Sequence, residues 1–216
     1  MNQTHRFRRG AIGAGAAILI VFVVLLLIVG GTLLTGYNGL ATQKEQTAAS
    51  WATLDSQYKR RADLIPQLVK VVEGAASFER STLDAVIQAR SSVTQMKLPA
   101  DALSDPDMLQ RYLDAQDQLG GALSRLLVTV ERYPDLKASQ NYLSLQDQVE
   151  GTENRLTVAR NDYIESVRAY NTRTKTFPGN VIAGLFGFQA LPQLEAATPA
   201  EREVPKIDFG ETGTGK

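Results

Sequence analysis

The 216-residue sequence contains no cysteine and only one histidine, His5, near the N-terminus. Without cysteine, the chain can form no disulfide and no thiolate metal site, and it has no cysteine nucleophile. A single histidine in the N-terminal arm excludes a histidine pair for metal binding and a Ser/His/Asp triad in the body of the chain. A glycine-rich phosphate loop is also missing. We therefore expect no enzyme activity, no cofactor and no metal site.

The sequence also lacks an excess of basic residues, since 23 Lys and Arg balance 23 Asp and Glu. Arg6, Arg8 and Arg9 lie in the first 34 residues, which contain no acid. The rest of the chain therefore carries 20 basic against 23 acidic residues, a net charge of −3. Contacts with nucleic-acid phosphates need a basic patch, so this weakly acidic body predicts no nucleic-acid partner.

One long apolar run is present, from Ala11 to Leu34, and it carries no charge. As a helix it would be about 36 Å long, and a bilayer core of about 30 Å needs roughly 20 such residues. A cleaved signal peptide is the alternative, but its apolar region is shorter, about 7–15 residues. We therefore predict a transmembrane anchor over residues 11–34, in contact with the lipid bilayer.

The charges on either side of this run predict its orientation. Three arginines directly precede it, whereas the first charge after it is Lys44. The positive-inside rule then places residues 1–10, a short basic arm, in the cytoplasm and the body outside. We expect a single-pass protein of the inner (cytoplasmic) membrane with an extracytoplasmic body.

Beyond the anchor, apolar residues recur at spacings of three and four in four separate stretches, as in coiled coils, and no strand pattern of useful length is present. Helices joined by short loops pack as antiparallel neighbours. The sequence therefore predicts an all-α fold, with an N-terminal transmembrane helix followed by an elongated antiparallel four-helix bundle. The bundle domain, with a short C-terminal apolar helix, covers residues 35–190, and a flexible tail covers 191–216.

Two of these stretches carry an arginine, Arg61 or Arg90, on the apolar face. Folding the second stretch back about residue 76 brings Arg90 level with Arg61, and an antiparallel fourth helix brings Glu153 to that height. Because an unpaired buried charge costs about 3–5 kcal/mol, we predict a structural polar layer of these three residues, with Asp117 or Gln118 nearby. A catalytic carboxylate cluster is the alternative, but bundle metal sites use Glu-x-x-His pairs and the body has no histidine.

Pro66 lies inside the first helical stretch. It has no N–H to donate to the carbonyl of Ala62, so we predict a kink in a continuous helix at this point. The alternative is a helix that restarts after a cap at Asp63, with Pro66 in its first turn.

The segment "FPGNVIAGLFGF" near the C-terminus is the main candidate for function. Its apolar side chains fall on one face of a short helix, which could cover the end of the bundle, dip into the membrane or bind a partner. The candidate partner or membrane patch comprises Val181, Ile182, Leu185, Phe186 and Phe188.

The body resembles the LemA family over roughly residues 37–188. The resemblance is carried by "YNGLATQKEQTAASWATLDSQYKRRADLIPQLVKVVEG", "FERSTLDAVIQAR" and "LLVTVERYPDLKASQNYLSLQDQVEGTENRLTVARNDYIESVRAYNTRTKTFPGNVIAGLFGF", in that order. Two departures are Ile164, where the family often has asparagine, and "LPQLEAA", which replaces an aromatic-acidic ending. The resemblance implies a bacterial membrane-anchored protein with an extended antiparallel four-helix domain, no enzyme activity and a link to envelope and membrane-protein homeostasis.

We therefore expect a non-enzymatic scaffold or adaptor that binds membrane or envelope proteins. One alternative is a self-associating homo-oligomer that organises or shapes the membrane, using the small residues of "GAIGAGAA" for helix contact. A carboxylate-based enzyme is a third and less favoured hypothesis.

Overall fold

The computed structural model describes residues 14–74, 78–96, 98–99 and 103–194. Within these ranges the chain is helical and has no strand, which confirms the predicted all-α class. The helices, in chain order, are α1 (Ala14–Glu73), α2 (Arg80–Gln95), α3 (Pro106–Val130), α4 (Pro134–Lys137), α5 (Gln140–Lys175) and α6 (Gly179–Phe186).

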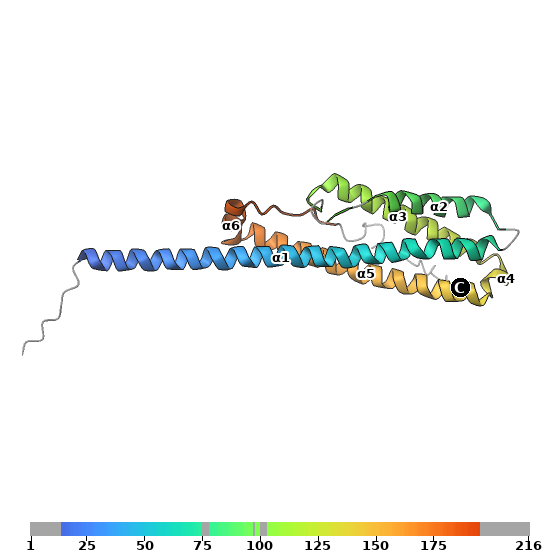
Figure 1. The fold of residues 1–216 in the computed structure, drawn as a ribbon, viewed down its shortest axis with the longest axis horizontal. Coiled ribbons are helices and arrows are strands. Elements are labelled where there is room, and N and C mark those ends of the chain that lie inside the picture. Colours follow the sequence, from blue (N-terminus) through green and yellow to red (C-terminus); the bar gives the residue numbers. More distant parts are fainter. Residues whose placement is uncertain (1–13, 75–77, 97, 100–102, 195–216) are drawn as a thin grey trace, which may run out of the picture.

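Helix α1 is 60 residues long and joins the predicted anchor to the body without a break (Figure 1). The predicted boundary between residues 34 and 35 therefore has no counterpart in the backbone. The apolar part of α1 is long and apolar enough to cross a membrane, and the 18-residue stretch that meets this criterion has no buried side chain. From Leu40 onward α1 buries one face against the other helices.

Local sequence signals explain three of the helix ends. The Asp105 carboxylate accepts hydrogen bonds from the N–H groups of Asp107 and Met108, each at 3.0 Å, and so caps the start of α3. The hydroxyl of Ser139 caps α5 by accepting from the N–H of Tyr142. Helix α6 ends at Gly187, whose φ of 74° is a left-handed conformation that favours glycine.

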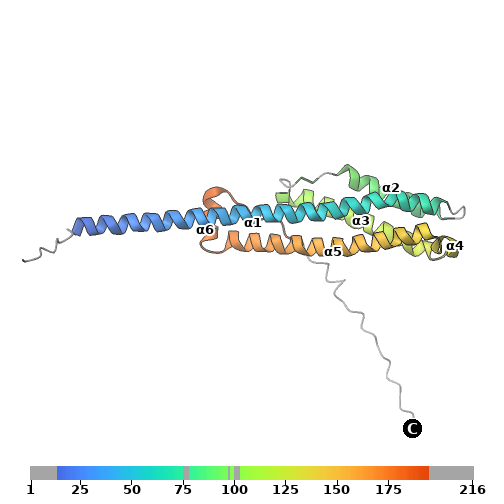
Figure 2. The ribbon, with the colours of Figure 1, turned by 60° about the horizontal axis from the view of Figure 1, so that its bottom comes forward.

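Contacts between side chains fix the directions of the helices. Along α1, the residue number rises from Thr47 through Trp51 to Arg61, while the number of the α5 residue in contact falls from Ser166 through Tyr163 to Glu153. Helices α1 and α5 are therefore antiparallel, and they lie side by side in both ribbon views (Figures 1 and 2). The Trp51 and Tyr163 ring centroids are 5.2 Å apart, so Trp51 lies at the level of the later part of α5.

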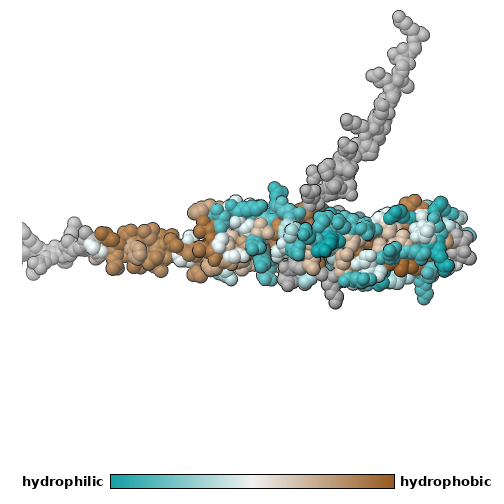
Figure 3. Space-filling model, turned by 90° about the horizontal axis from the view of Figure 1, so that it is seen from above, coloured by the Kyte–Doolittle hydropathy of each residue, from teal (hydrophilic) through white to brown (hydrophobic). Residues whose placement is uncertain are grey.

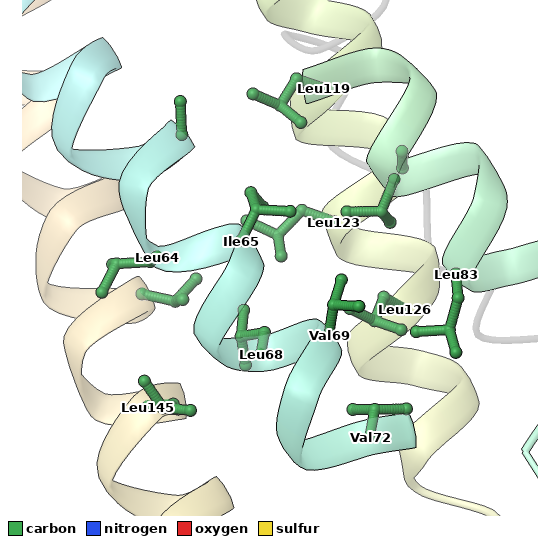
Figure 4. Close-up of a cluster of buried hydrophobic side chains, with 14 of the residues drawn as sticks. Leu64, Ile65, Leu68, Val69, Val72, Leu83, Leu119, Leu123, Leu126 and Leu145 are labelled. Atoms are coloured by element: carbon green, nitrogen blue, oxygen red, sulfur yellow. The ribbon is translucent and has the colours of Figure 1, made fainter. Parts of the chain in front are cut away.

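Three hydrophobic clusters follow one another along the body. The cluster farthest from the apolar part of α1 is formed where α1 meets α2, α3 and α5, and Figure 4 shows its leucines and valines pointing toward one another. A middle cluster contains Trp51, Tyr112 and Tyr163. A third, small cluster lies where α6 packs on α1, and it comprises Leu40, Tyr170, Ile182 and Ala183.

Two short segments complete the body. Pro134–Lys137 forms the single turn α4, with Leu136 buried. Residues 191–194 were assigned to the tail, but Leu194 is buried in the middle cluster and Leu191 packs against it. The rest of the predicted tail, and the basic arm 1–10, lie outside the described residues.

Candidate functional site

Arg61 is buried in the body, and three oxygen atoms surround its guanidinium. Its Nη2 donates to the main-chain oxygen of Gln116 at 2.7 Å and to the side-chain Oε1 of the same residue at 2.8 Å. Its Nη1 lies 3.5 Å from Oε1 of Glu153, whose side chain is 42% exposed. The structure thus brings together two of the three predicted layer residues. It adds Gln116, which the sequence had not indicated as a partner.

Arg90, the third predicted layer residue, has a different kind of partner. Its Nε donates to the main-chain oxygen of Ala62 at 2.9 Å and not to a carboxylate. Ala62 lies four residues before Pro66, so its oxygen is the one that would accept a helical hydrogen bond if residue 66 had an N–H. Arg90 therefore supplies the donor that the proline lacks. Helix α1 continues through Pro66, and the alternative of a helix restarted after Asp63 is not observed.

The body also has a partly open cavity of about 580 Å³, between α1, α3 and the chain that follows α2. Inside it the Tyr112 hydroxyl donates to Oδ1 of Asp55 at 2.8 Å, and Trp51 donates from its ring nitrogen to the oxygen of Leu98. Burial, followed by the nearby Asp55 carboxylate, raises the pKa of Tyr112 well above its usual value. This tyrosine therefore stays neutral and serves as a hydrogen-bond donor. Among the described residues, no group of three or more His, Asp or Glu side chains is arranged to hold a metal ion.

At the other end of the body, α6 packs against α1 beside two glycines. A Cβ added at Gly36 would overlap the side chain of Ile182, and one added at Gly39 would overlap the guanidinium of Arg173. The two glycines lie three residues apart, so they share one face of α1. Their missing side chains let α6 and the end of α5 approach closely. Nothing in the sequence analysis had marked these two positions.

The chain that follows α6 is held on α5 by hydrogen bonds. The Asn171 side chain donates to the oxygen of Leu191 at 2.7 Å and accepts from the N–H of the same residue at 2.8 Å. The Tyr170 hydroxyl donates to the oxygen of Gln189 at 3.0 Å. Because both side chains are buried, these bonds fix where α6 returns to the body.

The predicted apolar patch is divided between the two faces of α6. Ile182 is buried against α1, and Phe188 is half-buried, with its ring centroid 5.5 Å from that of Tyr37. Its other three residues, Val181, Leu185 and Phe186, are exposed. The expectation that α6 covers the end of the helices therefore describes one face, and the other face is open. Figure 3 shows hydrophobic surface at this end of the body, beside the apolar part of α1.

The fold and these contacts define a class: an all-helical protein in which one long helix combines a candidate membrane span with one helix of a packed body. A family model described as the LemA family matches residues 50–209 of the chain. No curated protein matches the sequence closely enough to serve as a relative. The chain belongs to the LemA family, as its motifs predicted.

Proposed function

We propose that this protein is a non-enzymatic, membrane-anchored scaffold or adaptor that holds a helical domain at the surface of the inner membrane to bind membrane or envelope proteins. The observation that carries the proposal is the continuity of α1 from the apolar stretch into the packed body. A continuous helix transmits position and orientation, whereas a flexible linker would not. The domain is thus presented at a fixed place relative to the bilayer.

The proposed domain is an elongated four-helix bundle made by the C-terminal part of α1 with α2, α3 and α5. The proposal is supported by the directions in which the helices in contact run. Helix α1 runs antiparallel to α5. It also contacts α2, the next helix in the chain, through the hydrogen bond from Arg90 to the oxygen of Ala62. From Asp55 to Arg61 on α1, the residues in contact on α3 rise from Tyr112 to Gln116, so these two helices run the same way. This is the up-down-up-down order of simple bundles.

For the topology, we propose a cytoplasmic N-terminus and an extracytoplasmic body. The support is the three arginines before the apolar run. The chain has no cysteine, so a single cysteine can be introduced without background. In intact cells a membrane-impermeant maleimide should label Val158→Cys, on the exposed face of α5, and should leave Gln3→Cys unlabelled until the membrane is opened. The reverse pattern would overturn the orientation.

Binding of other proteins is tested by cross-linking in native membranes. Photo-reactive residues would replace Val128 on α3 and Val158 on α5, which are exposed apolar side chains of the body. A matched position is Leu27 in the apolar part of α1. A dominant product with another protein from the body positions supports the adaptor. A ladder of self-products, or no product from either body position, contradicts it.

A further inference from the structure

Helix α6 lies at the level where the apolar run of α1 ends. Its Ile182 side chain occupies the space beside Gly36, which is two residues beyond Leu34. At about 1.5 Å per residue, this contact is only about 3 Å along the helix axis from the last residue of the run. If residues 11–34 span the bilayer, as proposed above, α6 is at the membrane surface. The inference below rests on that proposal.

The side of α6 that faces away from α1 is apolar and open. Leu185 is 66% exposed and Val181 is 50% exposed. Phe186, which is 52% exposed, lies at the edge of this side, with its ring centroid 4.9 Å from that of Tyr37 on α1. Phe177, which directly precedes the cis Phe177–Pro178 bond, is 83% exposed. Together with Leu34 and Tyr37 on α1, these residues form what we call the apolar collar. The members of the collar are Leu34, Tyr37, Phe177, Val181, Leu185 and Phe186.

The absence of charged residues around the collar favours contact with lipid over contact with water. Residues 177–194 contain no Asp, Glu, Lys or Arg. Charged side chains nearby are Arg173 and Lys175, which lie in the last turn of α5, one turn before the collar begins. The apolar side chains of the collar would then lie among the acyl chains, and Arg173 and Lys175 would lie at the level of the headgroups.

A second copy of the chain is a poorer match for this surface. Stable protein interfaces involve roughly 20–30 residues on each side, and the collar has six residues. The collar is also continuous with the proposed membrane-spanning surface of α1, through Leu34. We propose that the apolar collar is embedded in the leaflet on the side of the body, as a second contact with the bilayer that α1 crosses. Two contacts, unlike one, fix the tilt of the body.

Site-directed spin labelling of the full-length protein tests the collar. Single-cysteine variants Leu185→Cys and Phe177→Cys report on it, because both side chains are largely exposed and contribute little to the core. Val158→Cys on α5, at 60% exposure, is the matched control away from the collar, and Leu27→Cys, at 70%, reports on the span. Each labelled protein is reconstituted in phosphatidylcholine vesicles at low density. Accessibility is measured to oxygen, which partitions into lipid, and to a water-soluble nickel complex.

The expected result is an oxygen-to-nickel ratio several-fold higher at Leu185 and Phe177 than at Val158, with the highest ratio at Leu27. If Leu27 is in lipid while Leu185 and Phe177 match Val158, the collar is in water and the inference fails, although the anchor stands. If Leu185 and Phe177 are shielded from both reagents, a protein covers the collar and the inference also fails. If Leu27 itself matches Val158, the proposed anchor is wrong and the inference falls with it.

Discussion

The guanidinium of Arg61 contacts helices α3 and α5 at the same time. Two bonds to Gln116 at 2.7 and 2.8 Å are short, whereas the 3.5 Å approach to Glu153 joins Arg61 to a partly exposed carboxylate. This ion pair is longer than the two hydrogen bonds, and the carboxylate is partly screened by water because 42% of the Glu153 side chain is exposed. Buried hydrogen bonds to a charged group contribute more, about 1.5–3 kcal/mol. At the scale of single residues, the Arg61–Gln116 pair therefore dominates this layer.

Substitution of Gln116 and of Glu153 should lower the free energy of unfolding by different amounts. Gln116→Leu removes a buried acceptor from a charged donor and should lower the free energy of unfolding by about 1.5–3 kcal/mol. Glu153→Gln should lower it by less than about 1 kcal/mol, since that pair is partly exposed. Urea denaturation of the full-length protein in detergent, followed by circular dichroism, measures both. A larger loss for Glu153→Gln would show that the carboxylate is the main partner.

The carbonyl oxygen of Ala62 receives no helical hydrogen bond from Pro66, and Arg90 donates to it instead. Ala62 is 3% exposed, and the Arg90 Nε donor lies 2.9 Å from its oxygen. Arg90→Met should cost about 1–3 kcal/mol of unfolding free energy, because it leaves this oxygen unpaired. In a Pro66→Ala background, residue 66 regains its N–H, so the same change should cost clearly less. A double-mutant cycle measures this difference, and equal costs in the two backgrounds would contradict the pairing of proline with arginine.

Buried tyrosines predict how stability changes in alkaline solution. Burial raises the pKa of Tyr163 to about 12, from an ordinary value of 10.0. Folding thus favours the neutral hydroxyl, so its contribution is complete below pH 10 and is lost as the pH rises from 10 through 12. The unfolding free energy should therefore fall above pH 10. Burial also raises the pKa of Tyr58, Tyr142 and Tyr170, which adds to the same loss.

Tyr163→Phe isolates one part of this effect. The Tyr163 hydroxyl is buried and has no hydrogen-bond partner among the described residues, so its removal should leave stability at pH 8 unchanged or slightly higher. At pH 12 the variant should be more stable than the parent by about 2–3 kcal/mol, from two pKa units at about 1.4 kcal/mol each. Tyr112→Phe is the control, since loss of its bond to Asp55 should cost about 1 kcal/mol at pH 8. Identical pH profiles for Tyr163→Phe and the parent protein would contradict the raised pKa.

Helix α6 packs on both α1 and α5. Its two buried residues, Ile182 and Ala183, lie in one cluster with Leu40 of α1 and Tyr170 of α5, and Ile182 lies beside Gly36. The chain after α6 is held by bonds from Tyr170 and Asn171. A helix of 8 residues is too short to be stable alone. It is therefore stabilised by its contacts with α5 and α1, including the close approach that Gly36 permits.

Replacing that glycine should release α6 from α1. Gly36→Leu places a side chain where Ile182 lies, so hydrogen exchange of residues 179–188 should become faster while the rest of the body keeps its protection. Gly31→Leu is the matched control, because nothing lies within 4 Å of a Cβ at that glycine. Hydrogen exchange with mass spectrometry gives both results. Unchanged exchange in Gly36→Leu would show that α6 does not need this contact.

For the whole molecule, α1 sets the reach of the body. From Leu34 to Glu73 it is continuous, and 40 residues of helix span about 60 Å. The far end of the body, where Gly74 and Ser139 lie around one cavity, is therefore held well away from the apolar part of α1. Such an arm brings the exposed faces of α3 and α5 to a defined height.

That height is a measurable prediction. In supported phosphatidylcholine bilayers, neutron reflectometry should find protein density that extends about 60 Å from the membrane surface, because α1 emerges as one unbroken helix. A tilt would lower this value smoothly. Insertion of a flexible Gly-Ser linker after Thr35 should collapse the layer toward the surface. A thin layer for the parent protein, equal to that of the linker variant, would show that α1 bends where it leaves the membrane.

The sequence by itself determined the class of fold and the family. Apolar spacing of three and four predicts helices wherever it is sustained, and a long uncharged run predicts the candidate span, since both patterns depend on local periodicity and composition. Helix starts at Asp105 and Ser139 are local for the same reason. The sequence also predicted that Arg61 and Glu153 lie at the same height in antiparallel helices. This was possible because every helical residue adds the same rise, so that the height of a residue follows from its number.

Only the tertiary structure decided which atoms meet at those levels. The number of residues between two positions gives the height along a helix but not the direction of each side chain. The sequence therefore placed Arg90 in a layer with a carboxylate, whereas its partner in the structure is the Ala62 carbonyl, to which Pro66 cannot donate. Gln116, Gly36 and Gly39 gained their roles from neighbours distant in sequence. Helix α6 divides its apolar residues between α1 and the open side for the same reason. Which side chains are buried depends on how the helices pack together, so local sequence patterns do not determine it.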